Sequence, residues 1–278
     1  MPALIDFFHT RNHRPALALA WDAARVTSGI PAAGYDSDFA RSYEPGRQLS
    51  SAAQTTWQAA VDPYLRAAHT VVDAGAGTGR FARLFAGAPA QLVIAVEPSP
   101  DMRRVGQNAA IDRSLCWMAG TAEQLPLASR SADVIWTAFT THYLDLRLAG
   151  GEFRRVLRDD GCVLVWHAFP EVFDELEWYR WFPSARAIDE GRMPTLERVA
   201  ATFHAAGLDI VDQTTFRMQI ADDLHELADR LAHRAISTLR LISDDEFERG
   251  LAELRRFADS ATAGPVSSPN ILATFRPR

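Results

Sequence analysis

The sequence predicts an α/β fold built around a parallel sheet, and three observations support this prediction. From residue 69 onward, short runs rich in Val and Ile alternate with longer helical patterns, which is typical of βαβ units. The first of these runs ends in a dense group of glycines, where the backbone must turn tightly or approach a ligand closely. The chain has 278 residues, which is enough for one such sheet and a helical appendage.

Five apolar runs are predicted to be strands of this sheet. Between the second and third run, Ser99 followed by Pro and Asp is typical of a helix start. Further helices are predicted at residues 79–86 and at about 148–157, the second ended by the Asp-Asp-Gly sequence at 159–161. The five strands are expected at residues 69–74, 91–97, 114–119, 132–139 and 161–169.

The pattern changes after the fifth strand. Residues 170–194 combine tryptophans with three prolines and are expected to form an irregular lid segment. The sequence of Ser243 and Glu246 is typical of a capping box at the start of a helix. The expected order of elements is a helix from Thr195 to about residue 206, a strand at 208–216, two helices within 221–260, a loop at 264–269 and a last strand at 271–277.

These patterns divide the chain into four parts. The N-terminal part is mostly helical and carries Phe7, Phe8 and Trp21. Its apolar face needs a partner, so we expect it either to cover the active site or to exchange with a neighbouring subunit in a homodimer. The four parts are an N-terminal helical extension or lid at 1–60, a ligand-binding core at 61–169, an aromatic lid segment at 170–194, and the completion of the sheet with a helical cap at 195–278.

Charge and composition disfavour several kinds of partner. The formal net charge of −6 offers no electrostatic attraction to a polyanion, so no nucleic acid is expected as a partner. No segment approaches the roughly 20 apolar residues that span a bilayer, and the N-terminus lacks the pattern of a secretory signal. We therefore expect a cytoplasmic protein without a membrane partner. Cys116 and Cys162 lie in apolar runs and are expected in the core, and no metal site is predicted.

The glycine turn within residues 71–81, VVDAGAGTGRF, fits neither of two common phosphate-binding loops. A dinucleotide-binding turn needs glycine at its first, third and sixth positions, and here Gly75 and Gly77 are followed by Arg80 at the sixth. A phosphate loop would continue with Gly-Lys-Ser or Gly-Lys-Thr, which is absent. Asp73 precedes the turn, and a carboxylate there favours a ligand with an ammonium or hydroxyl group.

A second carboxylate stands at the end of the next predicted strand. Glu97 follows the first turn glycine at a spacing of about 20 residues, at which an acid can bind both hydroxyls of a ribose. Together, Asp73 and Glu97 predict a nucleoside joined to a cationic group as the ligand.

Three segments in order, DAGAGTGRF, VEPSPDM and AGTAEQLPLASRSADVIWTAFTTHYL, resemble the motifs of class I S-adenosylmethionine-dependent methyltransferases. The resemblance covers about residues 35–168 and is strongest to the small-molecule branch related to the ubiquinone/menaquinone enzymes. It implies a doubly wound, Rossmann-like, mostly parallel sheet of seven strands with a reversed last strand, an N-terminal helical lid and a C-terminal helical insertion. It also implies S-adenosylmethionine as cofactor and S-adenosylhomocysteine as product.

The resemblance implies roles for individual residues. Residues before and within the glycine turn would surround the methionine part of the cofactor, and Glu97 would hold its ribose. Met102 would pack on adenine, and residues 121–123 would border the purine edge; the family often has Asp at the first of these positions, where this chain has Thr. Tyr43 and Arg47 would cover the amino-acid end. The implied cofactor-binding set is Tyr43, Arg47, Asp73, Gly75, Gly77, Glu97, Pro98, Met102, Thr121, Ala122, Glu123 and Ala138.

Methyl transfer from a sulfonium is an in-line displacement, so the protein chiefly has to hold the acceptor and exclude water. By the resemblance, residues 138–142 lie near the methyl group. His142 is therefore the first candidate for a general base, and His167, after the fifth strand, is the second. Tyr143 is a candidate for orienting the substrate. Each of the three could instead pack in the core, and an activated carbon acceptor would need no base.

The segment WYRWF at 178–182 is too aromatic for a solvated loop, so it either stacks on a flat acceptor or attaches the cap to the sheet. The sequence thus predicts methyl transfer to an oxygen, nitrogen or carbon of a small aromatic or polycyclic metabolite, as in secondary metabolite biosynthesis. The alternatives are RNA or protein methylation, S-adenosylmethionine binding without transfer as a cyclase or regulator, and a nicotinamide-dependent oxidoreductase, which Arg80 opposes.

Overall fold

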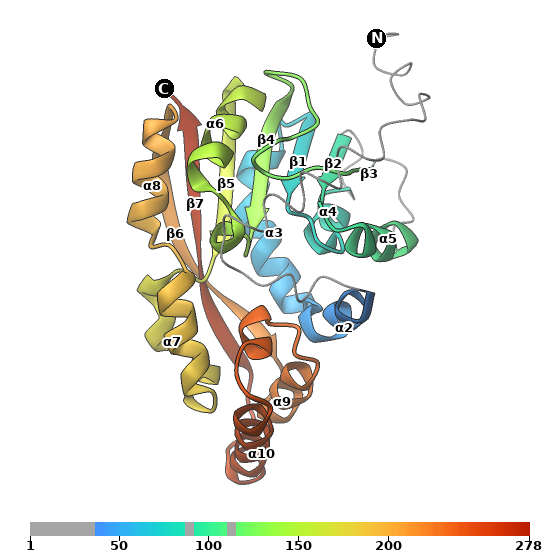
Figure 1. Ribbon diagram of the computed structural model, residues 1–278, viewed down its shortest axis with the longest axis vertical. Coiled ribbons are helices and arrows are strands. Elements are labelled where there is room, and N and C mark those ends of the chain that lie inside the picture. The colour runs from blue at the N-terminus through green and yellow to red at the C-terminus, as the bar shows by residue number, and fades with distance from the viewer. Residues whose placement is uncertain (1–36, 87–91, 110–114) are drawn as a thin grey trace.

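A computed structural model describes residues 37–86, 92–109 and 115–278 of the chain. The strands are β1 (Thr70–Ala74), β2 (Leu92–Val96), β3 (Leu115–Met118), β4 (Ala132–Ala138), β5 (Leu157–His167), β6 (Leu208–Ala221) and β7 (Val266–Pro277). They form one sheet in the order β3-β2-β1-β4-β5-β7-β6 (Figure 1). Only β7 runs antiparallel to its neighbours β5 and β6, and the other pairs are parallel. The predicted seven-stranded, doubly wound sheet with a reversed last strand is confirmed.

Helices cover both faces of this sheet (Figure 1). They are α2 (Ser37–Arg47), α3 (Ser51–Leu65), α4 (Arg80–Phe85), α5 (Pro100–Ala109), α6 (Leu146–Val156), α7 (Pro183–Arg192), α8 (Leu196–Ala205), α9 (Leu224–Ala232) and α10 (Asp244–Ser260). On one face, Trp136 of β4 is fully buried against Trp57 of α3 and Phe85 of α4. On the other face, Phe153 of α6 packs edge-on against Phe203 of α8. Because both faces are covered, the central residues of the parallel strands are mostly apolar.

Most predicted elements are found close to their predicted bounds. Ser99 accepts a hydrogen bond from the Met102 amide at the start of α5, and Thr195 accepts one from the Arg198 amide at the start of α8. Cys162 is buried and Cys116 partly buried, and both are free thiols. The predicted helices that carry Phe7, Phe8 and Trp21 lie outside the described residues.

Two predicted breaks are wrong because a strand continues through each of them. The expected loop at 264–269 belongs largely to β7, which begins at Val266 because residues 266–269 pair with β6 in a long antiparallel ribbon. The expected stop at 159–161 lies inside β5, which begins directly after α6 with Leu157 paired to Ala132. Asp159 and Asp160 are exposed in an irregularity of the register between β4 and β5, whereas Ser267 and Ser268 are partly buried on the paired ribbon.

The prediction of an irregular segment at 170–194 is wrong for its second half. Two 3-10 helices, η3 (Pro170–Glu175) and η4 (Glu177–Arg180), are followed by the regular helix α7. Pro170 and Pro183 stand in the first turns of η3 and α7. Proline is tolerated there because the amide it lacks would have no helical partner, so these prolines begin helices rather than interrupt them.

A helical cap lies around the far end of the β6–β7 ribbon (Figure 1) and consists of α7, α9, η5 (Ser237–Arg240) and α10. The two helices predicted within 221–260 are confirmed as α9 and α10. Ser243 caps α10 by accepting from the Glu246 amide, but the Glu246 carboxylate accepts from the Ser184 amide of α7 instead of completing a capping box. Phe182 stacks on Phe247, so the cap has an apolar core of its own.

The close approach of α10 to η4 predicts the effect of a single methyl group. A Cβ on Gly250 would lie 2.8 Å from the Phe182 ring and would also clash with the Trp181 carbonyl. Although glycine to alanine in a helix normally stabilises by about 0.5–1 kcal/mol, we expect Gly250→Ala to lower the unfolding free energy by about 1–3 kcal/mol in urea denaturation. Gly151→Ala in α6, where nothing lies within 4 Å, is the matched control. Equal stability of the two variants would contradict this docking.

Candidate active site

The glycine turn joins β1 to α4 at the point where the strand order reverses between β1 and β4, which is where ligands bind in doubly wound sheets. Gly75, Gly77 and Gly79 have φ values of 79°, 60° and 78°, in the left-handed region that glycine adopts without strain. A Cβ on Gly75 would lie only 2.7 Å from the Thr140 methyl carbon. The structure therefore brings the segment after β4, beginning at Ala138, against the turn.

Asp73 at the end of β1 is buried, with 2% of its surface exposed. Its Oδ2 has no hydrogen-bond partner among the described residues. Burial and the nearby charge of Glu97 raise the pKa of Asp73 to about 7, although the Ala82 amide and Arg80 act in the opposite direction. An unpaired buried carboxylate is costly, so this oxygen marks a place for a ligand group that donates hydrogen bonds or carries positive charge.

Glu97 after β2 connects the glycine turn to the start of α5. Its Oε2 accepts from the Gly77 amide at 2.9 Å, and its Oε1 accepts from the Ser99 amide at 2.8 Å. Arg103 donates to the carbonyl oxygens of Glu97 and Pro98. Burial raises the pKa of Glu97, while the two amides and Arg103 act to lower it. This carboxylate thus has a structural role that the spacing of the sequence did not indicate.

The remaining residues of the implied adenosine site lie at the same edge of the sheet. Met102 is buried, and its terminal methyl is 3.5 Å from the Cβ position of Gly77. Ala122 is buried after β3, beside Thr121, which forms a bridge pair with the residue three positions later. Glu123 accepts from the Asp145 amide at 3.0 Å, so its carboxylate is engaged with the start of α6.

Arg47 of α2 and Arg80 of α4 meet at this edge. The guanidinium of Arg47 lies 4.9 Å from the centre of the Phe139 ring, and its buried Nε has no hydrogen-bond partner among the described residues. Arg80 donates to the Arg47 carbonyl at 2.6 Å, and burial lowers the pKa of Arg80 to about 10. Phe139 has a φ of 57°, which is uncommon for a residue with a side chain and occurs often at functional sites. The sequence analysis used Arg80 only as the residue that breaks the dinucleotide-binding motif and did not predict its place in the site.

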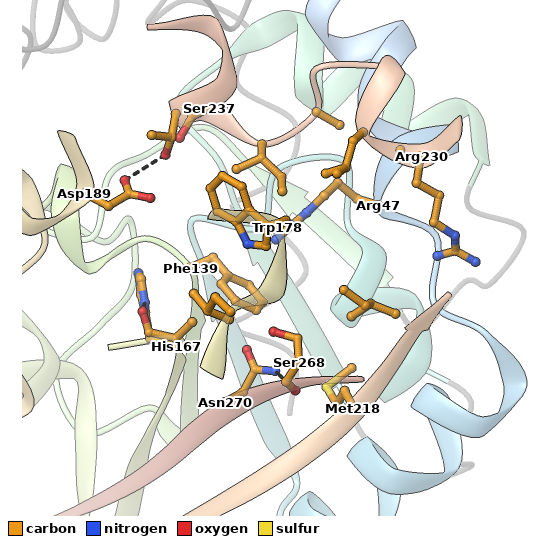
Figure 2. Close-up of a pocket in the computed structure, with 18 of the residues that line it drawn as sticks. Arg47, Phe139, His167, Trp178, Asp189, Met218, Arg230, Ser237, Ser268 and Asn270 are labelled. Carbon is orange, nitrogen blue, oxygen red and sulfur yellow. Dashed lines mark hydrogen bonds between the residues drawn. The ribbon is translucent and has the colours of Figure 1, made fainter. Parts of the chain in front are cut away.

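A cavity of about 180 Å³ lies between this edge and the cap (Figure 2). Its polar lining includes Tyr43, Arg47, Arg80, His142, Tyr143 and His167. Its apolar wall combines residues after β4 with residues of η3, η4 and α9. These residues are Phe139, Phe173, Leu176, Trp178, Leu227 and Leu231.

The aromatic segment at 178–182 is divided between the cavity wall and the cap. Trp178 and Tyr179 line the cavity, and Figure 2 shows the Trp178 ring among the lining residues. Trp181 and Phe182 do not line it and pack against α10 through Phe257 and Phe247. The first two residues are available to an acceptor, and the other two attach the cap.

A closed polar network holds the cavity wall that α7 and η5 form. The buried carboxylate of Asp189 accepts from the Tyr179 hydroxyl at 2.8 Å, from Thr238 at 2.7 Å and from the Arg192 Nε at 2.9 Å. Arg192 also donates to Ser237 and Thr238. A buried network with all its hydrogen bonds formed rigidifies its surroundings. Asp189 and Thr238 are 49 positions apart, so their contact could not be predicted from the sequence.

Two histidines meet at the ends of the neighbouring strands β4 and β5. His142 Nδ1 lies 3.3 Å from His167 Nε2, and His167 Nδ1 lies 2.9 Å from the Ala168 carbonyl oxygen. Burial, His167 and Arg192 lower the pKa of His142 well below its ordinary value. Burial lowers the pKa of His167 to about 4, against the effect of the Ala168 carbonyl. Both rings are therefore neutral near pH 7.

The strand order, the glycine turn and the two acids at the strand ends define a class I methyltransferase domain. Residues 72–165 match the family model described as "Methyltransferase domain". The chain therefore carries a domain of this family, as its motifs predicted. No group of three or more His, Cys, Asp or Glu residues that could hold a metal ion occurs in the described part of the chain.

Relatives of known sequence and structure agree with this class. An uncharacterised methyltransferase of Mycobacterium tuberculosis is 37% identical over 115 residues, which are 41% of this chain and 45% of that protein. The ubiquinone/menaquinone biosynthesis C-methyltransferase UbiE of Rubrivivax gelatinosus is 37% identical over 103 residues, 36% of this chain and 39% of that protein. The chain thus aligns with less than half the length of these relatives.

A crystal structure of a putative methyltransferase from an antibiotic biosynthesis pathway of Anabaena variabilis has the same fold. It matches with a TM-score of 0.63 at 21% identity and covers 81% of this chain and 99% of that chain. The shared fold therefore extends well beyond the segment that the sequence comparison aligns. Among the helices of the described residues, none is long and apolar enough to cross a membrane.

Proposed function

We propose that the protein transfers a methyl group from S-adenosylmethionine to a small aromatic or polycyclic acceptor. The observation that carries this proposal is the buried carboxylate of Asp73, whose Oδ2 has no hydrogen-bond partner among the described residues, beside a glycine turn at the reversal point of a methyltransferase sheet. An ammonium group of the cofactor would satisfy this oxygen. The carboxylate of Asp73 therefore fits the cofactor that the motifs imply.

The cofactor would supply an electrophilic methyl group on a sulfonium, and the protein would supply its position and a dry surrounding. Glu97 would hold the ribose with the lone pairs that its two backbone amides leave, and Met102 would pack on adenine. Arg47, for which no ion pair is found within the described part of the chain, would pair with the cofactor carboxylate. Arg80, Tyr43 and Phe139 would keep water from that end of the site.

The size of the cavity favours a small acceptor. A volume of about 180 Å³ beneath a cap with its own apolar core suits a compact ring system better than an exposed side chain or nucleotide of a macromolecule. The net charge of −6 also disfavours RNA. A cytoplasmic location and a homodimer formed through the N-terminal residues remain parts of this proposal.

We expect the purified protein to bind S-adenosylmethionine and S-adenosylhomocysteine in calorimetric titrations and to show no heat with NAD. Transfer of labelled methyl groups to compounds of a metabolite extract would separate an enzyme from a cyclase or regulator that only binds the cofactor. Binding of NAD without binding of S-adenosylmethionine would contradict the proposal and support the oxidoreductase alternative.

A further inference from the structure

The hydrogen bonds of the two histidines determine which ring nitrogen carries a proton. The Ala168 carbonyl can only accept, so His167 Nδ1 carries the hydrogen that it donates across 2.9 Å. Because His167 is neutral, its Nε2 is then a bare acceptor. His142 Nδ1, 3.3 Å away, must therefore donate to it, which leaves the His142 Nε2 with a lone pair. That nitrogen is buried and has no partner in the described part of the chain.

We propose that His142 Nε2 is the general base for an acceptor hydroxyl of a phenol or enol, and that His167 is the positioning residue that fixes its tautomer. This inference rests on the proposed methyl transfer and narrows its acceptor. His142 lines the cavity beside Tyr143, and a hydroxyl of an acceptor bound against its ring would donate to the lone pair of the buried Nε2. The chain from the Ala168 carbonyl through His167 to His142 holds the imidazole as an acidic partner holds it in a catalytic triad.

The strength of this base favours a hydroxyl of intermediate acidity. An imidazole is a far weaker base than an alkoxide, and burial lowers the pKa of His142 further, so an aliphatic alcohol is a poor match for this base. A carboxylic acid is already ionised near pH 7 and needs no base. Phenols and enols remain, and the aromatic wall suits a ring.

In the step, the acceptor oxygen forms a bond to the methyl carbon while the carbon–sulfur bond of the sulfonium breaks. The sulfur keeps the electron pair of that bond and becomes a neutral thioether. The hydroxyl proton moves to His142 Nε2, and the resulting imidazolium carries the positive charge that the sulfonium loses. Its low pKa favours release of the proton to water after product leaves.

The tautomers can be measured without any turnover. In long-range ¹⁵N–¹H spectra of the protein loaded with S-adenosylhomocysteine, we expect His142 and His167 both to be protonated at Nδ1 and bare at Nε2. The variants His142→Gln and His167→Gln assign the signals. A proton on the His142 Nε2 in the wild-type protein would overturn the proposal. This readout is independent of methyl transfer, so its failure is distinguishable from failure of the proposed function.

A pair of isosteric probes tests the hydroxyl contact. Phenol and toluene have the same shape, and we expect the ratio of their affinities for the loaded protein to fall about tenfold in His142→Leu, because one hydrogen bond is lost. The ratio should fall similarly in His167→Leu and be retained in His167→Gln, whose amide oxygen can accept from His142. An unchanged ratio in His142→Leu would overturn the proposal. Calorimetric binding of S-adenosylhomocysteine by each variant verifies that the fold is intact.

Discussion

Replacing Asp73 by asparagine is expected to weaken S-adenosylmethionine binding about 10- to 100-fold while making the protein more stable above pH 7. The loss of affinity follows because a buried charged hydrogen bond contributes about 1.5–3 kcal/mol, and asparagine offers the cofactor no charge. The gain in stability follows because the native carboxylate is buried without a partner at Oδ2. Such opposite effects on binding and stability are expected where a binding site keeps an unsatisfied polar atom for its ligand.

The raised pKa of Asp73 determines how the effect of this substitution on stability changes with pH. Burial raises the pKa of Asp73 from 3.8 to about 7, so the folded protein favours the protonated form. The stability that this carboxyl contributes is complete below about pH 4 and is lost as the pH rises through about 7. The difference corresponds to an upper bound of about 4 kcal/mol, of which we expect Asp73→Asn to recover about 1–2 kcal/mol at pH 8.

Urea denaturation at pH 5 and pH 8, with calorimetric titration at the same two values, measures both effects. The stability gained by Asp73→Asn should be larger at pH 8, and cofactor affinity of the wild-type protein should rise with pH as the carboxylate ionises. Asp160→Asn, at an exposed position of β5, is the matched control and should change neither quantity. A destabilised Asp73→Asn variant with full affinity would rule out an unpaired carboxylate that receives the cofactor.

The sequence allowed the sheet to be predicted because the central residues of its parallel strands are largely buried and mostly apolar. It failed where distant pairing outweighs local composition. Residues 266–269 have the composition of a loop but pair with β6, about 50 positions earlier in the chain. In the same way, Pro183 suggested an irregular segment. It stands in the first turn of α7, where the backbone amide that proline lacks would have no helical partner.

The sequence predicted those site residues whose positions are determined by the ends of the strands. His142 follows β4 and His167 ends the neighbouring strand β5, so their contact could have been inferred from the strand order that the motifs imply. The roles of Arg80 and of the Asp189–Arg192 network could not, because they depend on the packing of α2 and the cap. Side chains that contact only through such packing leave no periodic signal in a sequence.

Glu97→Ala is expected to abolish cofactor binding, as the motif implies, and also to destabilise the fold, in contrast to Asp73→Asn. The substitution removes the acceptor of the Gly77 and Ser99 amides, and each unpaired buried amide costs about 1–3 kcal/mol. Relief of the buried charge, which raises the pKa of Glu97, offsets part of this loss. We therefore expect the unfolding free energy to fall by about 2–4 kcal/mol.

The motif alone would predict that Asp73 and Glu97 both bind the cofactor and that replacing either leaves the stability of the fold unchanged. The hydrogen bonds of Glu97 predict a different result for Glu97→Ala. Urea denaturation and calorimetric titration of Glu97→Ala, Glu97→Gln and Glu123→Ala distinguish the two. Glu97→Gln keeps one acceptor oxygen and should lie between the wild-type protein and Glu97→Ala in stability. Glu123→Ala loses a single bond to the Asp145 amide and should be the least affected. If Glu97→Ala were as stable as the wild-type protein, the carboxylate would not hold the glycine turn, and the turn would be ordered by its glycines alone.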